Sequence, residues 1–86
     1  MLRVYRQLTV IAMKRIKLYT REGCGLCEEA EEMLAAILPD VELVDVDASA
    51  KWAALYGLRV PVLTIDERVV LEGRFTEAAV ATLFTG

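Results

Sequence analysis

The sequence contains no histidine among its 86 residues. This absence removes the side chain that most often acts as a general base and most often binds metal ions. Basic residues are also few: ten against thirteen acidic residues give a net charge of −3, without the basic excess typical of nucleic-acid binding. No apolar run approaches the roughly 18 residues that span a membrane. A hydrophobic content of 56% indicates one small folded domain, which we expect to be a monomer that binds neither nucleic acid nor membrane.

A segment typical of a secretory signal is not recognisable either. Arg3 and Arg6 precede a short apolar run at residues 8–13, but Lys14 and Arg15 interrupt that run. We therefore expect a cytoplasmic protein, in which reducing conditions disfavour structural disulfides.

Cysteine occurs only twice, at Cys24 and Cys27. The spacing lets the two thiols meet across one turn of a helix, so that they can alternate between dithiol and disulfide. A cross-link around so short a loop would remove little entropy from the unfolded chain, and a purely structural role is therefore disfavoured. In a reducing compartment such a pair is typical of catalysis or metal binding.

The periodicity of apolar residues predicts the element order β-α-β-α-β-β-α. The predicted strands are residues 16–20, 41–46, 60–65 and 68–71, of which the last two form a hairpin around Asp66 and Glu67. The first helix covers residues 24–38 and ends before Pro39; Asp47 caps a short helix that Gly57 ends, and Thr76 caps the last helix. The parallel β-α-β half and the hairpin predict an α/β fold with a four-stranded mixed sheet and helices on its faces.

The first residues fit this scheme less well. Residues 1–13 form an N-terminal extension, and residues 14–86 form the domain. Apolar and polar side chains alternate in the extension, which is typical of an extra strand, whereas the alternative is a disordered extension.

The helical pattern assigns different roles to the two cysteines. Cys24 lies at the start of the helix, where free backbone N–H groups stabilise a thiolate. Cys27 lies one turn further along, on the apolar stripe that also contains Leu34. We therefore expect Cys24 to attack a disulfide and Cys27 to resolve the mixed disulfide that results.

Charged residues near the motif act in opposite directions. Arg21 could stabilise a Cys24 thiolate, whereas Glu22, Glu28 and Glu29 would oppose it. The sequence leaves the balance between them open.

Four segments in this order carry a resemblance to a known family. They are Leu18-Tyr19-Thr20, Cys24-Gly25-Leu26-Cys27, Arg59-Val60-Pro61-Val62 and Gly73. Over about residues 14–84 the chain resembles a glutaredoxin of the thioredoxin-like superfamily. It is most similar to small bacterial glutaredoxin-like proteins with a Cys-x-Leu-Cys site.

The resemblance implies a thioredoxin-like (glutaredoxin-type) fold, with Cys24 as the nucleophile and Cys27 as the resolving cysteine. It also implies that Pro61 follows a cis peptide bond and faces the active site. The residues that we expect to bind substrate or glutathione are Arg21, Arg59, Val60, Pro61, Gly73 and Arg74. Here Arg59 and Arg74 lie where a glutathione carboxylate or an acidic partner could bind.

The leading hypothesis is a thiol–disulfide oxidoreductase that reduces disulfide-bearing proteins or glutathione mixed disulfides. It needs no bound cofactor; glutathione would be a co-substrate, and the electron donor would be glutathione or a flavin-containing reductase. An alternative is an iron–sulfur or zinc carrier, in which two chains, or one chain and glutathione, complete the thiolate set that one chain cannot fill. A third is a thioredoxin-like binding module without turnover.

Overall fold

A computed structural model describes residues 15–38 and 40–84. The strands are β1 (Ile16–Thr20), β2 (Glu42–Asp45), β3 (Val62–Ile65) and β4 (Arg68–Glu72). The helices are α2 (Gly25–Ile37), the 3-10 helix η1 (Val46–Ala48), α3 (Ala50–Tyr56) and α4 (Glu77–Phe84). The predicted element order is confirmed, while the predictions for residues 1–13 and Pro39 lie outside the described residues.

The four strands form one mixed sheet in the order β2-β1-β3-β4. β1 is parallel to β2 and antiparallel to β3, and β3 and β4 form the predicted hairpin. Asp66 and Glu67 at its turn have φ angles of 51° and 70°, the left-handed values that a tight two-residue turn requires. The Asp66 carboxylate accepts a hydrogen bond of 2.9 Å from the backbone N–H of Arg15, which ties the turn to the start of β1.

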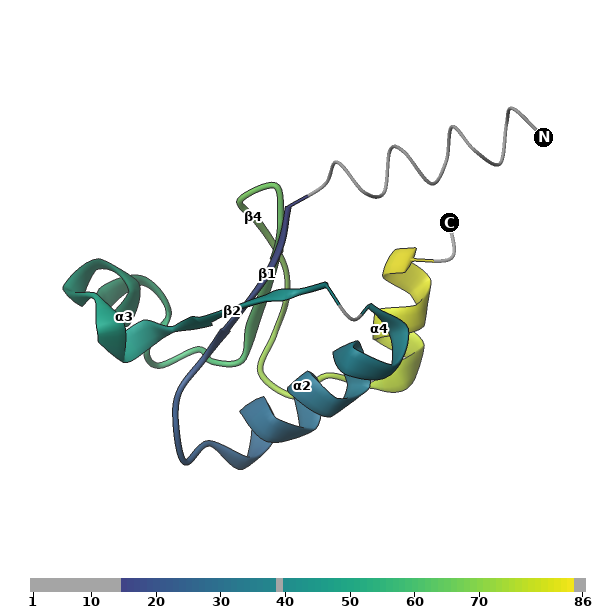
Figure 1. Cartoon of the computed structure of the whole chain (residues 1–86), viewed down its shortest axis with the longest axis horizontal. Coiled ribbons are helices and arrows are strands. Elements are labelled where there is room, and N and C mark those ends of the chain that lie inside the picture. Colours follow the sequence, from purple (N-terminus) through teal and green to yellow (C-terminus); the bar gives the residue numbers. More distant parts are fainter. Residues whose placement is uncertain (1–14, 39, 85–86) are drawn as a thin grey trace.

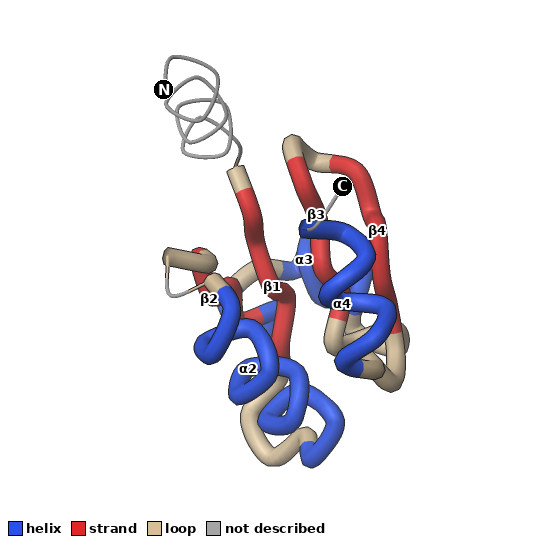
Figure 2. Tube along the Cα trace, turned by 90° about the vertical axis from the view of Figure 1, so that its right-hand side faces the viewer, coloured by secondary structure: helices blue, strands red, loops and turns tan. Residues whose placement is uncertain are grey.

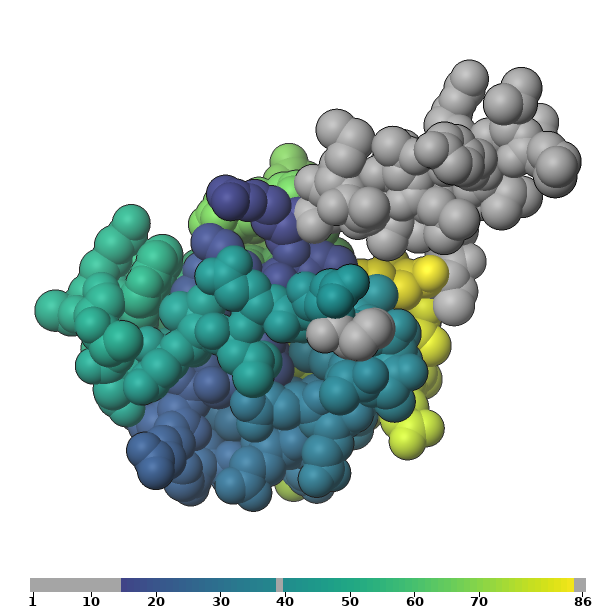
Figure 3. All heavy atoms as spheres, in the orientation of Figure 1, coloured from purple at the N-terminus to yellow at the C-terminus, as the bar shows by residue number. Residues whose placement is uncertain are grey.

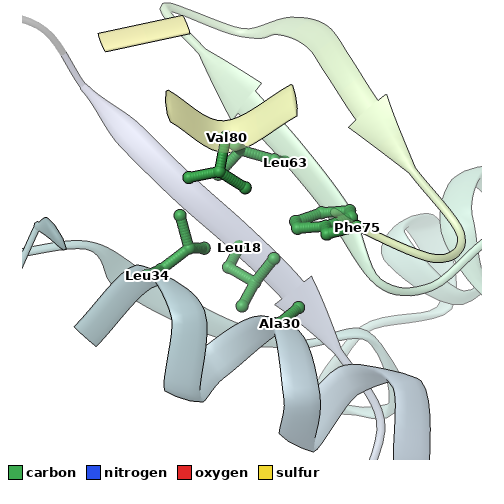
Figure 4. Close-up of a cluster of buried hydrophobic side chains, with 6 residues drawn as sticks. All are labelled: Leu18, Ala30, Leu34, Leu63, Phe75 and Val80. Carbon is green, nitrogen blue, oxygen red and sulfur yellow. The ribbon is translucent and has the colours of Figure 1, made fainter. Parts of the chain in front are cut away.

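Helices cover both faces of this sheet because adjacent residues of a strand point to opposite sides. Leu18 packs with residues of α2 and α4, and the cluster on that face is shown in Figure 4. Tyr19 points to the other face, where it contacts Trp52 and Tyr56 of α3. Figure 2 shows α2 and α4 in front of the strands and α3 behind them.

Side chains fill the space between these layers. In Figure 3 the atoms of α2 and of the segment from β2 to α3 cover most of β1, the strand that carries Leu18 and Tyr19. Both side chains are at most 1% exposed. None of the helices in the described part of the chain is long and apolar enough to cross a membrane.

One predicted helix cap is wrong. Asp47 does not cap α3, because the side chain of Asp45 accepts a hydrogen bond from the Asp47 N–H and starts η1 instead. The helix α3 begins after Ser49, whose Oγ accepts from the N–H groups of Lys51 and Trp52. The Asp47 carboxylate is thereby available for another contact.

The cap of the last helix is as expected. The Oγ1 of Thr76 accepts a hydrogen bond of 3.1 Å from the N–H of Ala79, and the Thr76 carbonyl accepts one from Val80. Val80 is fully buried in the cluster with Leu18. This helix therefore closes the face of the sheet on which α2 also lies.

Replacing Leu18 should show how far stability depends on this core. We expect Leu18→Ala to lower the free energy of unfolding by about 2–5 kcal/mol, since it leaves a cavity between β1 and α2. Its neighbour in the parallel pair, Leu43, is 55% exposed, and Leu43→Ala should change that energy by about 0.5 kcal/mol or less. Urea unfolding followed by circular dichroism compares the two variants, and equal losses would contradict the assignment of the core.

Candidate functional site

Cys24 lies at the junction between the end of β1 and the start of α2. The chain turns there through Gly23, whose φ of 79° is a left-handed value that glycine adopts without strain. The N–H of Cys24 donates to the carbonyl of Arg21 over 3.3 Å and closes this turn. Cys24 itself is the N-cap of α2, the position that the sequence predicts.

The sulfur of Cys24 takes the role that a hydroxyl or carboxylate usually has at a helix start. Its Sγ accepts a hydrogen bond of 3.2 Å from the backbone N–H of Cys27, and the side chain is half-buried. The sulfur lies at the positive end of the helix with a backbone donor aimed at it. The geometry therefore favours an accessible nucleophile.

Cys27 has the opposite environment. It is 1% exposed and lies on the buried side of α2 with Ala30 and Leu34. Burial raises the pKa of the Cys27 thiol to about 11, and its hydrogen bond with Cys24 adds to the increase, while the backbone of Arg21 acts against it. Both cysteines are free in this structure.

Arg21 is bound in a way that the sequence does not predict. Its Nε and Nη2 each donate to the Asp47 carboxylate over 3.0 Å, and its Nη1 donates to the carbonyl of Gly57 over 2.9 Å. The guanidinium is therefore paired with Asp47, while the expectation that it also stabilises a Cys24 thiolate stays a prediction. Asp47 is a residue of this site that sequence reasoning missed, because a polar residue before a helix is so often a cap.

Gly57 ends α3 as predicted, but the reason differs from the expected one. Its φ of −54° is an ordinary helical value, so no left-handed turn requires a glycine here. A Cβ at this position would lie 2.4 Å from the carbonyl oxygen of Ala53 and 3.0 Å from the Nη2 of Arg21. The absence of a side chain is what lets Arg21 reach the backbone.

The start of β3 lies beside the end of β1, at the same end of the sheet as Cys24 (Figure 1). Tyr19 pairs with Val62, so that Pro61 comes next to the last residue of β1. The peptide bond between Val60 and Pro61 is cis, and the Pro61 side chain is buried. The Pro61 carbonyl accepts a hydrogen bond of 2.9 Å from the N–H of Gly73. Three of the predicted binding residues, Val60, Pro61 and Gly73, therefore lie together at this end of the sheet.

Arg59 is also paired within the chain. Its Nε donates to Oε2 of Glu72 over 3.0 Å, its Nη1 donates to the carbonyl of Leu55, and its guanidinium lies 5.3 Å from the centre of the Tyr56 ring. Arg74, the remaining predicted residue, follows Gly73 and is exposed. Of the two arginines that we expected to receive a carboxylate, one already holds a carboxylate of this chain.

Comparison with known proteins agrees with this architecture. The family model for the glutaredoxin-like domain (DUF836) matches residues 15–85. The chain belongs to the glutaredoxin-like family. The thioredoxin-like fold follows from this membership and from the mixed four-stranded sheet with helices on both faces. Its relatives thereby support a redox role of the thioredoxin type in general.

Two solved structures are similar to this glutaredoxin-like chain. The X-ray structure of the Northeast Structural Genomics target protein XcR50 from X. campestris is 37% identical, with a TM-score of 0.69 over 79% of this chain and 92% of that one. The holo form of glutaredoxin C1 from Populus tremula x tremuloides is 15% identical, with a TM-score of 0.57 over 83% of this chain and 76% of that one, a likeness of fold. Comparison with curated proteins finds no match.

Metal-binding residues do not gather at the site of this glutaredoxin-like protein. Within residues 15–38 and 40–84, no three or more histidine, cysteine, aspartate or glutamate side chains are grouped so as to hold a metal ion. Asp45 and Asp47 instead have the capping and ion-pair roles described above. The thiol donors of the described site are Cys24 and Cys27.

The difference between the two sulfurs should appear in alkylation. At neutral pH we expect iodoacetamide to modify Cys24 and leave Cys27 untouched, because a pKa of about 11 keeps Cys27 protonated and burial excludes the reagent. The raised pKa means that Cys27 labelling should increase about tenfold per pH unit until the pH nears that value. Peptide mass mapping measures both rates. Unfolded protein, in which the rates should converge, is the control, and equal labelling of the native chain would contradict the assignment.

Proposed function

We propose that this protein is a thiol–disulfide oxidoreductase that uses Cys24 and Cys27 to reduce protein or glutathione mixed disulfides. The observation that carries the proposal is the contrast between the two sulfurs. Cys24 is accessible and receives an N–H donor at the start of α2, while Cys27 is buried directly behind it. Such a pair is suited to attack followed by resolution.

In the first step the Cys24 thiolate attacks one sulfur of the substrate disulfide. A bond forms between Cys24 and that sulfur, and the other substrate sulfur leaves as a thiolate. Cys27 then gives up its proton and attacks the Sγ of Cys24, so that the internal disulfide forms and the second substrate thiolate leaves. Two electrons pass from the protein dithiol to the substrate, and the released thiolates take up protons according to the pH.

The first step prepares Cys27 for the second. Burial is the largest cause of the raised pKa of Cys27, and the interaction with the Cys24 sulfur and its negative charge add to the increase. Once Cys24 is bonded to substrate it carries no charge, and that part of the increase is lost. Cys27 therefore becomes a better nucleophile at the stage at which it must act.

A thiol donor closes the cycle by reducing the Cys24–Cys27 disulfide. Either glutathione or a reductase that presents a dithiol could serve, because each attacks the exposed sulfur of Cys24 by the same exchange chemistry. The site therefore needs no cofactor of its own.

Two other roles make different demands on the same cysteines. A carrier of zinc or an iron–sulfur cluster would need further thiolates from a second chain or from glutathione, since such sites take more sulfur ligands than one chain offers here. A binding module would keep its partner when Cys24 is replaced. The buried resolving position of Cys27 favours exchange chemistry over either role.

Single-cysteine variants test the proposal. Cys24→Ser should abolish reduction of a glutathionylated peptide, because no nucleophile remains in reach of solvent. Cys27→Ser should attack once and then accumulate a mixed disulfide, visible in the mass spectrum as protein plus one substrate half. The variant lacking both cysteines gives the background. Turnover by Cys24→Ser at the rate of the unchanged protein would refute the assigned roles.

A further inference from the structure

Two of the arginines around the site, Arg21 and Arg59, are paired with carboxylates of this chain. Arg21 is held by Asp47 through two hydrogen bonds, and Arg59 is held by Glu72. Each guanidinium also donates to a backbone carbonyl of the segment around the end of α3. Their positive charges are therefore committed to the fold of this chain.

Between the contacts of these arginines the chain exposes a leucine. Leu58 is 101% exposed and lies between Gly57, whose carbonyl binds Arg21, and Arg59. The N–H of Arg59 donates to the carbonyl of Tyr56 over 2.9 Å, so the turn that carries Leu58 is held on both sides. A single exposed leucine is common on protein surfaces, but this one is presented by a fixed turn at the Cys24 end of the sheet.

The exposed charged residues close to Cys24 in the described part of the chain are negative. Glu22, Glu28 and Glu29 are exposed within five residues of it in the chain. Arg74 is the exposed cation beside the cis-proline segment. An approaching substrate therefore meets more carboxylate than guanidinium.

We propose that this site selects disulfides in polypeptide segments that carry an apolar and a basic residue next to the cysteine, and that it disfavours glutathione. The inference rests on the proposed oxidoreductase function and names its substrate class. The apolar residue packs on Leu58, which removes apolar surface of both partners from water. The basic residue approaches the exposed glutamates, which attract it at low ionic strength.

Glutathione meets the reverse situation because it carries more carboxylates than ammonium groups. To reach Arg59 its carboxylate must displace Glu72, and one exposed ion pair then merely replaces another. Among the arginines described at the Cys24 end of the sheet, only Arg74 could bind a carboxylate of glutathione without first losing a carboxylate of this chain. The pairing within the chain thus removes most of the gain that an anionic substrate would obtain.

The test measures single turnovers of the reduced protein, so that no electron donor is needed. The probes are glutathione disulfide and the symmetric disulfides of three short peptides, in which the cysteine is flanked by Leu and Lys, by Ala and Lys, or by Leu and Glu. Each rate is divided by the rate at which mercaptoethanol reduces the same disulfide, which corrects for intrinsic reactivity. We expect the Leu and Lys peptide to react fastest, and its advantage over the Leu and Glu peptide to shrink in high salt.

Variants assign the preference to residues. Leu58→Ser should slow the Leu and Lys peptide by roughly threefold to tenfold and abolish its advantage over the Ala peptide. Leu43→Ser, the same change at an exposed position of β2, should have no effect. Glu72→Gln releases Arg59 and should speed glutathione disulfide by roughly two- to fivefold. Glu67→Gln, which breaks the exposed pair with Lys17 at the far end of the hairpin, is its control.

The outcomes separate the inference from the function on which it rests. If glutathione disulfide reacts at least as fast as the Leu and Lys peptide, or if Leu58→Ser behaves like Leu43→Ser, the substrate preference is wrong and the oxidoreductase function stands. If the reduced chain reacts with none of the disulfides, both are wrong.

Discussion

The packing of α2 on the sheet is the constraint on which both the core and the site depend. Cys27, Ala30 and Leu34 lie on the buried side of this helix, each 1% exposed, and Leu18 of β1 packs against the last two. Burying this stripe fixes the rotation of the helix, and rotation fixes which cysteine faces the interior. Cys24 is left at the first, unpaired turn, where backbone N–H groups have no partner within the helix. The chemical difference between the sulfurs is therefore a consequence of ordinary hydrophobic packing.

This dependence explains why the cysteine pair and the element order could be predicted from the sequence. Periodicity along one helix is local information, and it places Cys24 at the start and Cys27 on the stripe without reference to the rest of the fold. The hairpin around Asp66 and Glu67 is local as well, and so is the cap at Thr76. In each case the residues that determine the feature lie within a few positions of one another.

The partners of the arginines could not be predicted in this way. Arg21 and Asp47 are 26 residues apart, and they meet because β1 and β2 are parallel neighbours whose ends lie at the same edge. Arg59 and Glu72 are 13 residues apart, and they meet because the start of β3 lies beside the end of its antiparallel neighbour β4. The local pattern around Asp47 suggests a helix cap, yet Asp45 and Ser49 on either side of it take the capping roles. The sequence signal for the Arg21–Asp47 pair is a combination of two facts. Arg21 follows β1 and the acidic Asp47 lies just after β2, and the ends of two neighbouring parallel strands lie close together.

The pairs Arg21–Asp47 and Arg59–Glu72 contribute little to stability, because water screens ion pairs that are exposed to solvent. Their larger consequence is for where charge lies. Arg21 holds the turn after α3 against the loop before Cys24, and Arg59 ties that turn to α3 and to the end of β4. Because both are bound to carboxylates, they add little net positive charge. A site that used the same arginines to bind anionic substrates would have to leave them unpaired when empty, and would lose these tethers. Loop positioning and anion binding therefore compete for the same side chains, and the contacts of Asp47 and Glu72 show that in this structure positioning prevails.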